Sequence, residues 1–362
     1  MNDKHPDWIL PLAHKNDFVF NSSARDFMVE EIPLYEFSGS GEHLILKVRK
    51  KDLTTWQMLD DISSYVGIRR RDIGYAGLKD KHAMTIQYIS LPVKYEERIQ
   101  SFAHDKIKIL DIQKHNNKIR VGHLKGNRFK LRLKKVLGIQ KEMILSVLEW
   151  IEHNGVPNYF GYQRFGIHAD NWQEGKKILS GELKIKDRKN REFLISAYQS
   201  YLFNNWLSKR VEISRLLEEF SENETENILN LKSGVLKETK KQSNFFKILH
   251  GDLMMHYPYG KIFYAQDVIS ESLRFVQKDI SVTGLIPGRR AQIAKESSRS
   301  IEELYDMDIA QNGSRRYAWI FPSDIKADYD PQKAHMQLEF FLPKGSYATN
   351  IVDMLKGAKI NG

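Results

Sequence analysis

The stretch from Ile119 to Leu133 constrains the fold most, because apolar and basic residues alternate along it. In an extended chain, successive side chains point to opposite faces. One face would carry Asn127, Phe129, Leu131 and Leu133, and the other would carry Arg128, Lys130 and Arg132. The pattern therefore predicts a strand that buries its apolar face and keeps its other face basic.

This strand lies in a basic tract from Lys106 to Lys135, which holds eleven Lys and Arg residues and one carboxylate, Asp111. The chain of 362 residues has a net charge of +10, and outside the tract its basic and acidic residues balance. Such clustering is typical of a surface that binds a polyanion, and a solvated basic face without a ligand is the alternative. Three consecutive cations, Arg69, Arg70 and Arg71, are either phosphate contacts or ordinary surface charge.

Composition excludes several classes of protein and site. The chain has no cysteine, which excludes disulfides and thiolate metal sites, and no two histidines have the helical spacing of a zincin. No apolar run approaches the roughly 20 residues of a membrane span, and the first residues lack the apolar core of a signal peptide. We expect a cytoplasmic protein with room for two domains and without a metal.

The segment from Gly74 to Ser90 places one carboxylate, Asp80, between the ammonium groups of Lys79 and Lys81. Nearby cations keep a carboxylate ionised, which suits a nucleophile or a charge stabiliser better than a proton donor. A solvated turn with charges of both signs is the alternative. The residues after this turn alternate like a strand.

Helices and strands are also predicted along the rest of the chain. Helices are expected from Thr54 to Gly67, over Ile139–Ile151, over Arg188–Arg210 and over Ser346–Lys356, and strands over Phe245–Leu249 and Met336–Leu342, with a turn at Gly284–Gly288. These predictions rest on helical spacing, capping residues and alternation.

The Asp80 segment, G-x-K-D-K-x-A-x-T-x-Q, resembles the signature of the TruD family of tRNA pseudouridine synthases. Four further segments resemble family motifs in the same order: DFMVEE at 26–31, GNRF at 126–129, NYFGYQRFG at 158–166 and LPKGSYAT at 342–349. The resemblance implies an α+β fold with a mixed, mostly antiparallel sheet, flanking helices and a central cleft. It also implies a catalytic domain made of residues 1–156 and 309–362, and an inserted α/β domain of residues 157–308.

The activity implied by this resemblance is isomerisation of a uridine in tRNA to pseudouridine, usually at position thirteen of the D arm, as in glutamate tRNA. Asp80 corresponds to the family's catalytic aspartate, and no cofactor is needed. The carboxylate could attack C1′ of the ribose or C6 of the base. The target nucleotide would be flipped out of the RNA. We expect a monomer with tRNA as its partner and no membrane.

The resemblance and the chemistry of the side chains together suggest a binding site. Phe27, Phe129 and Tyr347 would hold the flipped base, with Tyr347 standing where other members carry Phe, and Asn127 would bind the base edge. Lys79 or Lys81 would keep Asp80 ionised or hold a phosphate. The RNA backbone would be bound by Arg69, Arg70, Arg71, Arg128, Lys130 and Arg132.

Two other functions compete with this one. An RNA-binding protein without chemistry explains the basic tract but leaves Asp80 unexplained. A phosphate-transferring enzyme is disfavoured, because the sequence has neither a P-loop nor an acidic metal cluster.

Overall fold

The computed structural model describes residues 8–166 and 168–357. The described chain divides into two compact units. We call residues 17–146 and 322–345 the sheet unit, and residues 8–16, 147–321 and 346–357 the α5 unit after its longest helix. The domain boundaries expected at residues 156 and 309 are not those of the compact units, and the inserted domain stays a prediction.

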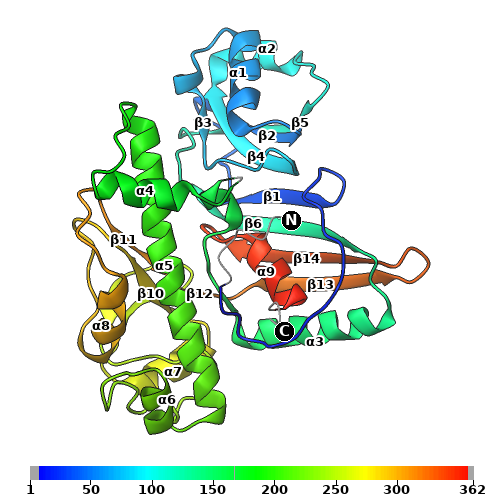
Figure 1. Ribbon diagram of the computed structural model, residues 1–362. Coiled ribbons are helices and arrows are strands. Elements are labelled where there is room, and N and C mark those ends of the chain that lie inside the picture. Colours follow the sequence, from blue (N-terminus) through cyan, green and yellow to red (C-terminus); the bar gives the residue numbers. More distant parts are fainter. Residues whose placement is uncertain (1–7, 167, 358–362) are drawn as a thin grey trace. The chain divides into compact units, whose positions relative to one another are not determined.

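The sheet unit is built on one eight-stranded sheet (Figure 1). Its order is β13 (Ser323–Asp330), β14 (His335–Pro343), β6 (Leu124–Lys134), β1 (Phe27–Pro33), β4 (Met84–Pro92), β2 (His43–Lys51) and β5 (Ile107–His115), with β3 (Gly74–Tyr75) paired to β4. Only β1 and β4 pair in parallel among these described strands. The predicted mixed, mostly antiparallel sheet is therefore confirmed.

Strand β6 has the predicted two faces, with Phe129, Leu131 and Leu133 buried. It begins at Leu124 rather than near Ile119, because residues 120–123 form a turn in which Gly122 has a φ of 92°. Gly126 allows β14 to approach closely, since a β-carbon there would lie 2.1 Å from the Leu342 carbonyl oxygen.

Helix α1 (Thr55–Val66) covers one face of the sheet at β2, β4 and β5. Thr54 and Gln57 form the expected capping box, and Gly67 ends the helix with a φ of 75°. Its buried side chains, Met58, Leu59, Ile62 and Val66, share a core cluster with apolar residues of these strands. Apart from α1, the unit contains α2 (Glu96–Gln100) and the first half of α3 (Gly138–Asn154).

The α5 unit combines helices with a four-stranded antiparallel sheet. The strands are β11 (Ser314–Tyr317), β10 (Ile280–Ile286), β8 (Leu253–His256) and β9 (Ile262–Tyr264), and a separate pair joins β7 (Val156–Pro157) to β12 (Trp319–Ile320). The helices are α4 (Asn171–Leu179), α5 (Arg188–Glu219), α6 (Glu222–Ile228), α7 (Val268–Val276), α8 (Glu296–Glu302) and α9 (Ala348–Lys356). Helix α5 packs on β10, where a β-carbon at Gly284 would lie 2.2 Å from the Trp206 ring.

Three local predictions need correction in the α5 unit. Helix α5 continues past Arg210 to Glu219, because buried apolar residues such as Ile213 and Leu217 extend its inner face. Residues 245–249 are buried but form no strand. The turn expected at 284–288 begins later, because β10 runs to Ile286. Within the described ranges, no helix has both the length and the apolar character that crossing a membrane requires.

Candidate active site

Asp80 lies in the loop between β3 and β4 of the sheet unit, and its side chain is half-buried. The backbone carbonyl of Asp80 accepts a hydrogen bond from Nζ of Lys50 at 2.8 Å. Among the described residues, none forms a hydrogen bond or ion pair with the Asp80 carboxylate. The loop is therefore held through its backbone, while the carboxylate remains available.

Lys50 is the cation beside Asp80 that sequence reasoning missed. Its side chain is fully buried, and its ammonium also donates to the Leu53 carbonyl at 2.6 Å. Burial lowers the pKa of Lys50 to about 8, and the Asp80 carboxylate opposes this shift. The alternation of the strand could have indicated that Lys50 is buried, because Lys50 occupies the next inward position after Leu44, Leu46 and Val48 in β2.

Lys79, one of the two lysines predicted to keep Asp80 ionised or to hold a phosphate, has its ammonium bound to other groups. Its ammonium lies 2.8 Å from Oε2 of Glu31 and donates to Oδ1 of Asn127 at 2.6 Å. Only 5% of the Lys79 side chain and 1% of the Glu31 side chain are exposed. Strand pairing explains the arrangement, because Glu31 of β1 stands opposite Asn127 of β6. Lys81, the other predicted partner of the carboxylate, is exposed.

Glu31 is a second residue that sequence reasoning passed over. It is buried at the end of the inward series Phe27, Val29 and Glu31 in β1, and its other carboxylate oxygen accepts a hydrogen bond from the backbone of Tyr88 at 3.2 Å. The sequence signal was a charged residue at a strand position whose alternation predicts a buried side chain, since a buried charge needs a partner.

A hydroxyl at the start of α1 fixes the Asp80 loop from another side. The backbone N–H of Lys79 donates to Oγ1 of Thr55 at 2.9 Å, and this hydroxyl donates to Oε1 of Gln87 at 3.1 Å. The Gln87 amide nitrogen and the Thr85 hydroxyl are buried and have no hydrogen-bond partner among the described residues. The loop thus lies against a polar patch on β4 that has unused hydrogen-bonding capacity.

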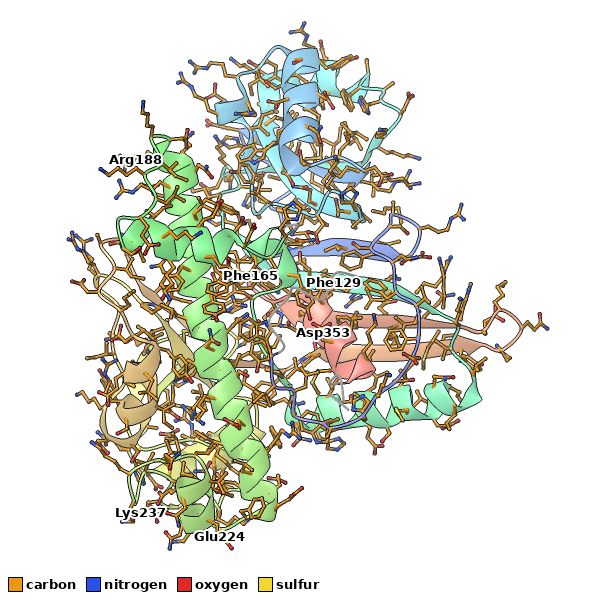
Figure 2. All side chains as sticks on the ribbon, in the orientation of Figure 1. Phe129, Phe165, Arg188, Glu224, Lys237 and Asp353 are labelled. Carbon is orange, nitrogen blue, oxygen red and sulfur yellow. The ribbon has the colours of Figure 1, made fainter. Side chains whose placement is uncertain are left out.

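Aromatic rings continue this face of the sheet toward β14. The rings of Phe27 and Phe129 stack with centroids 6.1 Å apart and an angle of 8°, and Phe340 stacks on Phe129 at 5.7 Å. Figure 2 shows Phe129 among these strands. All three rings are buried. Phe340, which the sequence did not single out, belongs to this row because β14 pairs it with Phe129.

The predicted residues are only partly brought together. Phe27, Lys79, Asp80, Asn127 and Phe129 belong to one sheet and the loop above it. Tyr347 belongs to the α5 unit, where it precedes α9. The expected central cleft remains a prediction.

The predicted backbone-binding residues are exposed or half-exposed, and most have acidic neighbours. Lys130 lies 2.9 Å from Glu339, and Arg128 lies 3.0 Å from Asp324. Arg132 is 3.8 Å from Asp26. Part of the positive charge on β6 is thus neutralised within the protein.

Two of the three consecutive arginines are also paired, while their surroundings remain open. Arg69 bonds Asp72 at 2.8 Å, and Arg70 bonds both oxygens of Asp60 while lying over the Trp56 ring. Together with Arg71 and Tyr75, these residues line a pocket of about 710 Å³. Among the residues that the structure describes, no group of three acids or histidines is arranged to bind a metal.

Comparison with known proteins gives matches along nearly the whole chain. A model of the family described as tRNA pseudouridine synthase D (TruD) matches residues 17–186 and 183–353. The chain is 53% identical over 347 residues to a tRNA pseudouridine synthase D of a Nitratiruptor species, and 49% identical over 350 residues to one of Wolinella succinogenes. These alignments cover 96% and 95% of this chain and 96% of each relative.

A solved structure of a TruD protein from Methanosarcina mazei is also similar, with 20% sequence identity. The match covers 98% of this chain and 96% of that chain with a TM-score of 0.68. It confirms the predicted α+β fold.

Proposed function

Because this chain belongs to the TruD family of tRNA pseudouridine synthases, we propose that it isomerises a uridine of tRNA to pseudouridine with Asp80 as the catalytic nucleophile. The observation that carries the proposal is the Asp80 loop itself. Lys50 and Thr55 hold its backbone, and its carboxylate is left without a partner among the described residues. A fixed carboxylate that is not consumed by an ion pair is suited to attack an electrophilic carbon.

The reaction needs no net transfer of a group. The carboxylate adds to C1′ of the ribose or to C6 of the base, the bond between N1 and C1′ breaks, and the uracil turns. C5 then bonds to C1′, the C5 proton leaves to solvent, the carboxylate departs and N1 regains a proton. Lys50 stays charged at neutral pH, and its ammonium fixes the loop through the Asp80 carbonyl. In this proposal the steps need only residues of the chain, the RNA and solvent protons.

Binding of the base would use the polar and aromatic row beside Asp80. Since Oδ1 of Asn127 already accepts from Lys79, the Asn127 amide nitrogen is the group that would donate to a uracil carbonyl. Phe27 and Phe129 would form an apolar wall beside the base. The family resemblance alone adds Tyr347 as a further stacking ring. A uridine must leave the RNA stack to reach these groups, which costs a few kcal/mol.

The finer features of the substrate follow from the family resemblance. We propose uridine thirteen in the D arm, as in glutamate tRNA, and a monomeric cytoplasmic enzyme that acts without a cofactor. The exposed Lys81 and Arg71 would contact phosphates of the RNA. Basic residues of β6 would do the same after breaking their ion pairs with acidic neighbours, as between Lys130 and Glu339.

The test of catalysis is release of the C5 hydrogen from tRNA that carries tritium at C5 of uridine. Asp80→Asn should abolish release while tRNA binding stays within about tenfold, because the amide keeps the shape but cannot act as a carboxylate nucleophile. Asp72→Asn is a matched control, since Asp72 is an exposed carboxylate near the same loop and pairs with Arg69. If Asp80→Asn releases tritium at the wild-type rate, Asp80 is not the catalytic nucleophile. If the wild type binds tRNA but releases no tritium, the protein binds RNA without modifying it.

The phosphate role of β6 has a separate test. Lys130→Ala combined with Arg132→Ala should flatten the dependence of log Kd on log salt concentration by about one to two. Their acidic neighbours, Glu339 and Asp26, would have to be outcompeted by phosphate. An unchanged slope in a filter-binding titration would show that this face does not contact RNA.

A further inference from the structure

Two arginines of the α5 unit, Arg164 and Arg316, are only partly exposed but have no carboxylate partner among the described residues. Burial and, to a smaller extent, the charge of Arg164 lower the pKa of Arg316 to about 10, while Tyr347 opposes this shift. The two like charges therefore lie close enough to repel each other, and both remain charged at neutral pH.

Two more deeply buried arginines of this unit, Arg210 and Arg315, are neutralised by carboxylates. Arg210 forms two hydrogen bonds with Asp252, each 2.8 Å long, and Arg315 pairs with Glu302 at 2.5 Å. Buried charges normally have such partners, because an unpaired buried charge is costly. The pair Arg164 and Arg316 departs from this pattern.

The hydrogen bonds of the pair hold each guanidinium from one side only. Arg164 donates from Nε to Ser200 and from Nη2 to Ser196, and Arg316 donates from Nε and Nη2 to Asn158. In each side chain, Nη1 has no hydrogen-bond partner among the described residues. Two positioned donors are thus left for a ligand.

Aromatic rings fix both guanidinium groups in place. Cζ of Arg316 lies 4.0 Å from the centre of the Phe160 ring, and Cζ of Arg164 lies 5.9 Å from the same centre. Arg316 also lies 5.8 Å from the Tyr347 ring. These contacts orient the cations without neutralising them.

The first turn of α9 adjoins this pair. Tyr347 is the N-cap residue, and its side chain makes no capping hydrogen bond. A β-carbon at Gly161 would lie 3.0 Å from Oγ1 of Thr349 and 3.2 Å from the Tyr347 ring, so the loop that carries Arg164 touches this turn. The Thr349 hydroxyl is buried and has no partner among the described residues. An uncapped helix start offers backbone N–H groups to an anion.

We propose that Arg164, Arg316 and the first turn of α9 form a site for one phosphodiester group of the RNA substrate. The site explains why the two arginines lack carboxylate partners although both lie near the Phe160 ring, and why the buried Thr349 hydroxyl has no partner among the described residues. It rests on the proposed function for its ligand, because RNA supplies the phosphodiester.

The test is a filter-binding titration of full-length protein with the tRNA substrate over a range of salt concentrations. Arg164→Gln and Arg316→Gln should each weaken binding about tenfold at low salt and reduce the slope of log Kd against log salt by about one, while Arg164→Lys restores most of the slope. Arg188→Gln is the matched control, because Arg188 is a fully solvated arginine of the same unit paired with Glu192 (Figure 2). It should leave both quantities unchanged.

Thermal unfolding of each variant shows whether it is folded. If Arg316→Gln does not fold, Arg164→Gln decides the question, because Arg164 bonds only two serine hydroxyls. Unchanged affinity and slope in folded Arg164→Gln would overturn the site, even if the wild type makes pseudouridine. If folded Arg164→Gln shows the reduced salt dependence but the wild type makes no pseudouridine, the phosphodiester site is supported and the proposed function is refuted.

Discussion

Replacing Lys50 by methionine tests whether a buried cation supports the Asp80 loop. The ammonium of Lys50 is fully buried and bonds two backbone carbonyls, those of Leu53 and Asp80. Burial lowers its pKa from 10.5 to about 8. A difference of this size corresponds to about 3 kcal/mol between the protonated and neutral forms.

The sign of the pH dependence follows from proton binding. Between pH 8 and about 10.5, the unfolded chain keeps the proton on Lys50 while the folded chain loses it. The free energy of unfolding of the wild type should therefore rise with pH in this window, relative to Lys50→Met, by about 3 kcal/mol in total. Below pH 8 both states are protonated and the difference between the two proteins should be constant.

The assay is urea unfolding of both proteins by circular dichroism at intervals from pH 6 to 10. Because the same tyrosines and acids titrate in both proteins, the difference between their free energies of unfolding isolates Lys50. Tritium release should also decline in the wild type as pH passes 8, since a neutral amine makes weaker hydrogen bonds than an ammonium to the Leu53 and Asp80 carbonyls that fix the loop. Parallel stability curves for the two proteins from pH 7 to 10 would refute the reasoning.

Two further stability measurements test other ionisable groups. Glu31→Gln should lower the free energy of unfolding by about 3–5 kcal/mol, because it leaves the ammonium of Lys79 buried without its carboxylate. Adding Lys79→Met should recover part of this loss. A loss below about 1 kcal/mol for Glu31→Gln in urea unfolding would contradict the prediction. Asp353 of α9 is half-buried, and desolvation raises the pKa of its carboxyl group to about 7 (Figure 2). Its folded state therefore holds a proton that the unfolded state has lost between about pH 4 and 7, so the wild type should lose stability as pH rises through this window and Asp353→Asn should not. Equal pH dependence of the melting temperature in both proteins would argue against this.

Periodic sequence features predicted the local structure well. The two faces of β6 and the capping box of α1 follow from alternation and from the Thr54–Gln57 spacing, and both are present. The length of α5 was underestimated because its last turns are mostly polar at the surface and are held by buried Ile213 and Leu217. The end of an element depends on tertiary packing, which the local pattern does not contain.

The site was less predictable than the fold. Asp80 stood out because of its neighbours in sequence, but the buried cation beside it, Lys50, did not. Lys79 turns to Glu31 and Asn127, and Lys50 approaches from a strand thirty residues away. Strand pairing decides which side chains meet, and the pairings of β1 with β6 and of β2 with β4 are not visible in any single segment.

The sheet unit closes late in synthesis. Strand β6 ends at Lys134, but its outer neighbour β14 begins at His335. A nascent chain that has reached the end of β12 thus carries a partial sheet whose β6 edge has open backbone donors and acceptors, and Phe129 lacks the ring of Phe340. A stop codon before His335 would leave this edge open permanently, so a C-terminal truncation that removes β14 should yield an aggregating product.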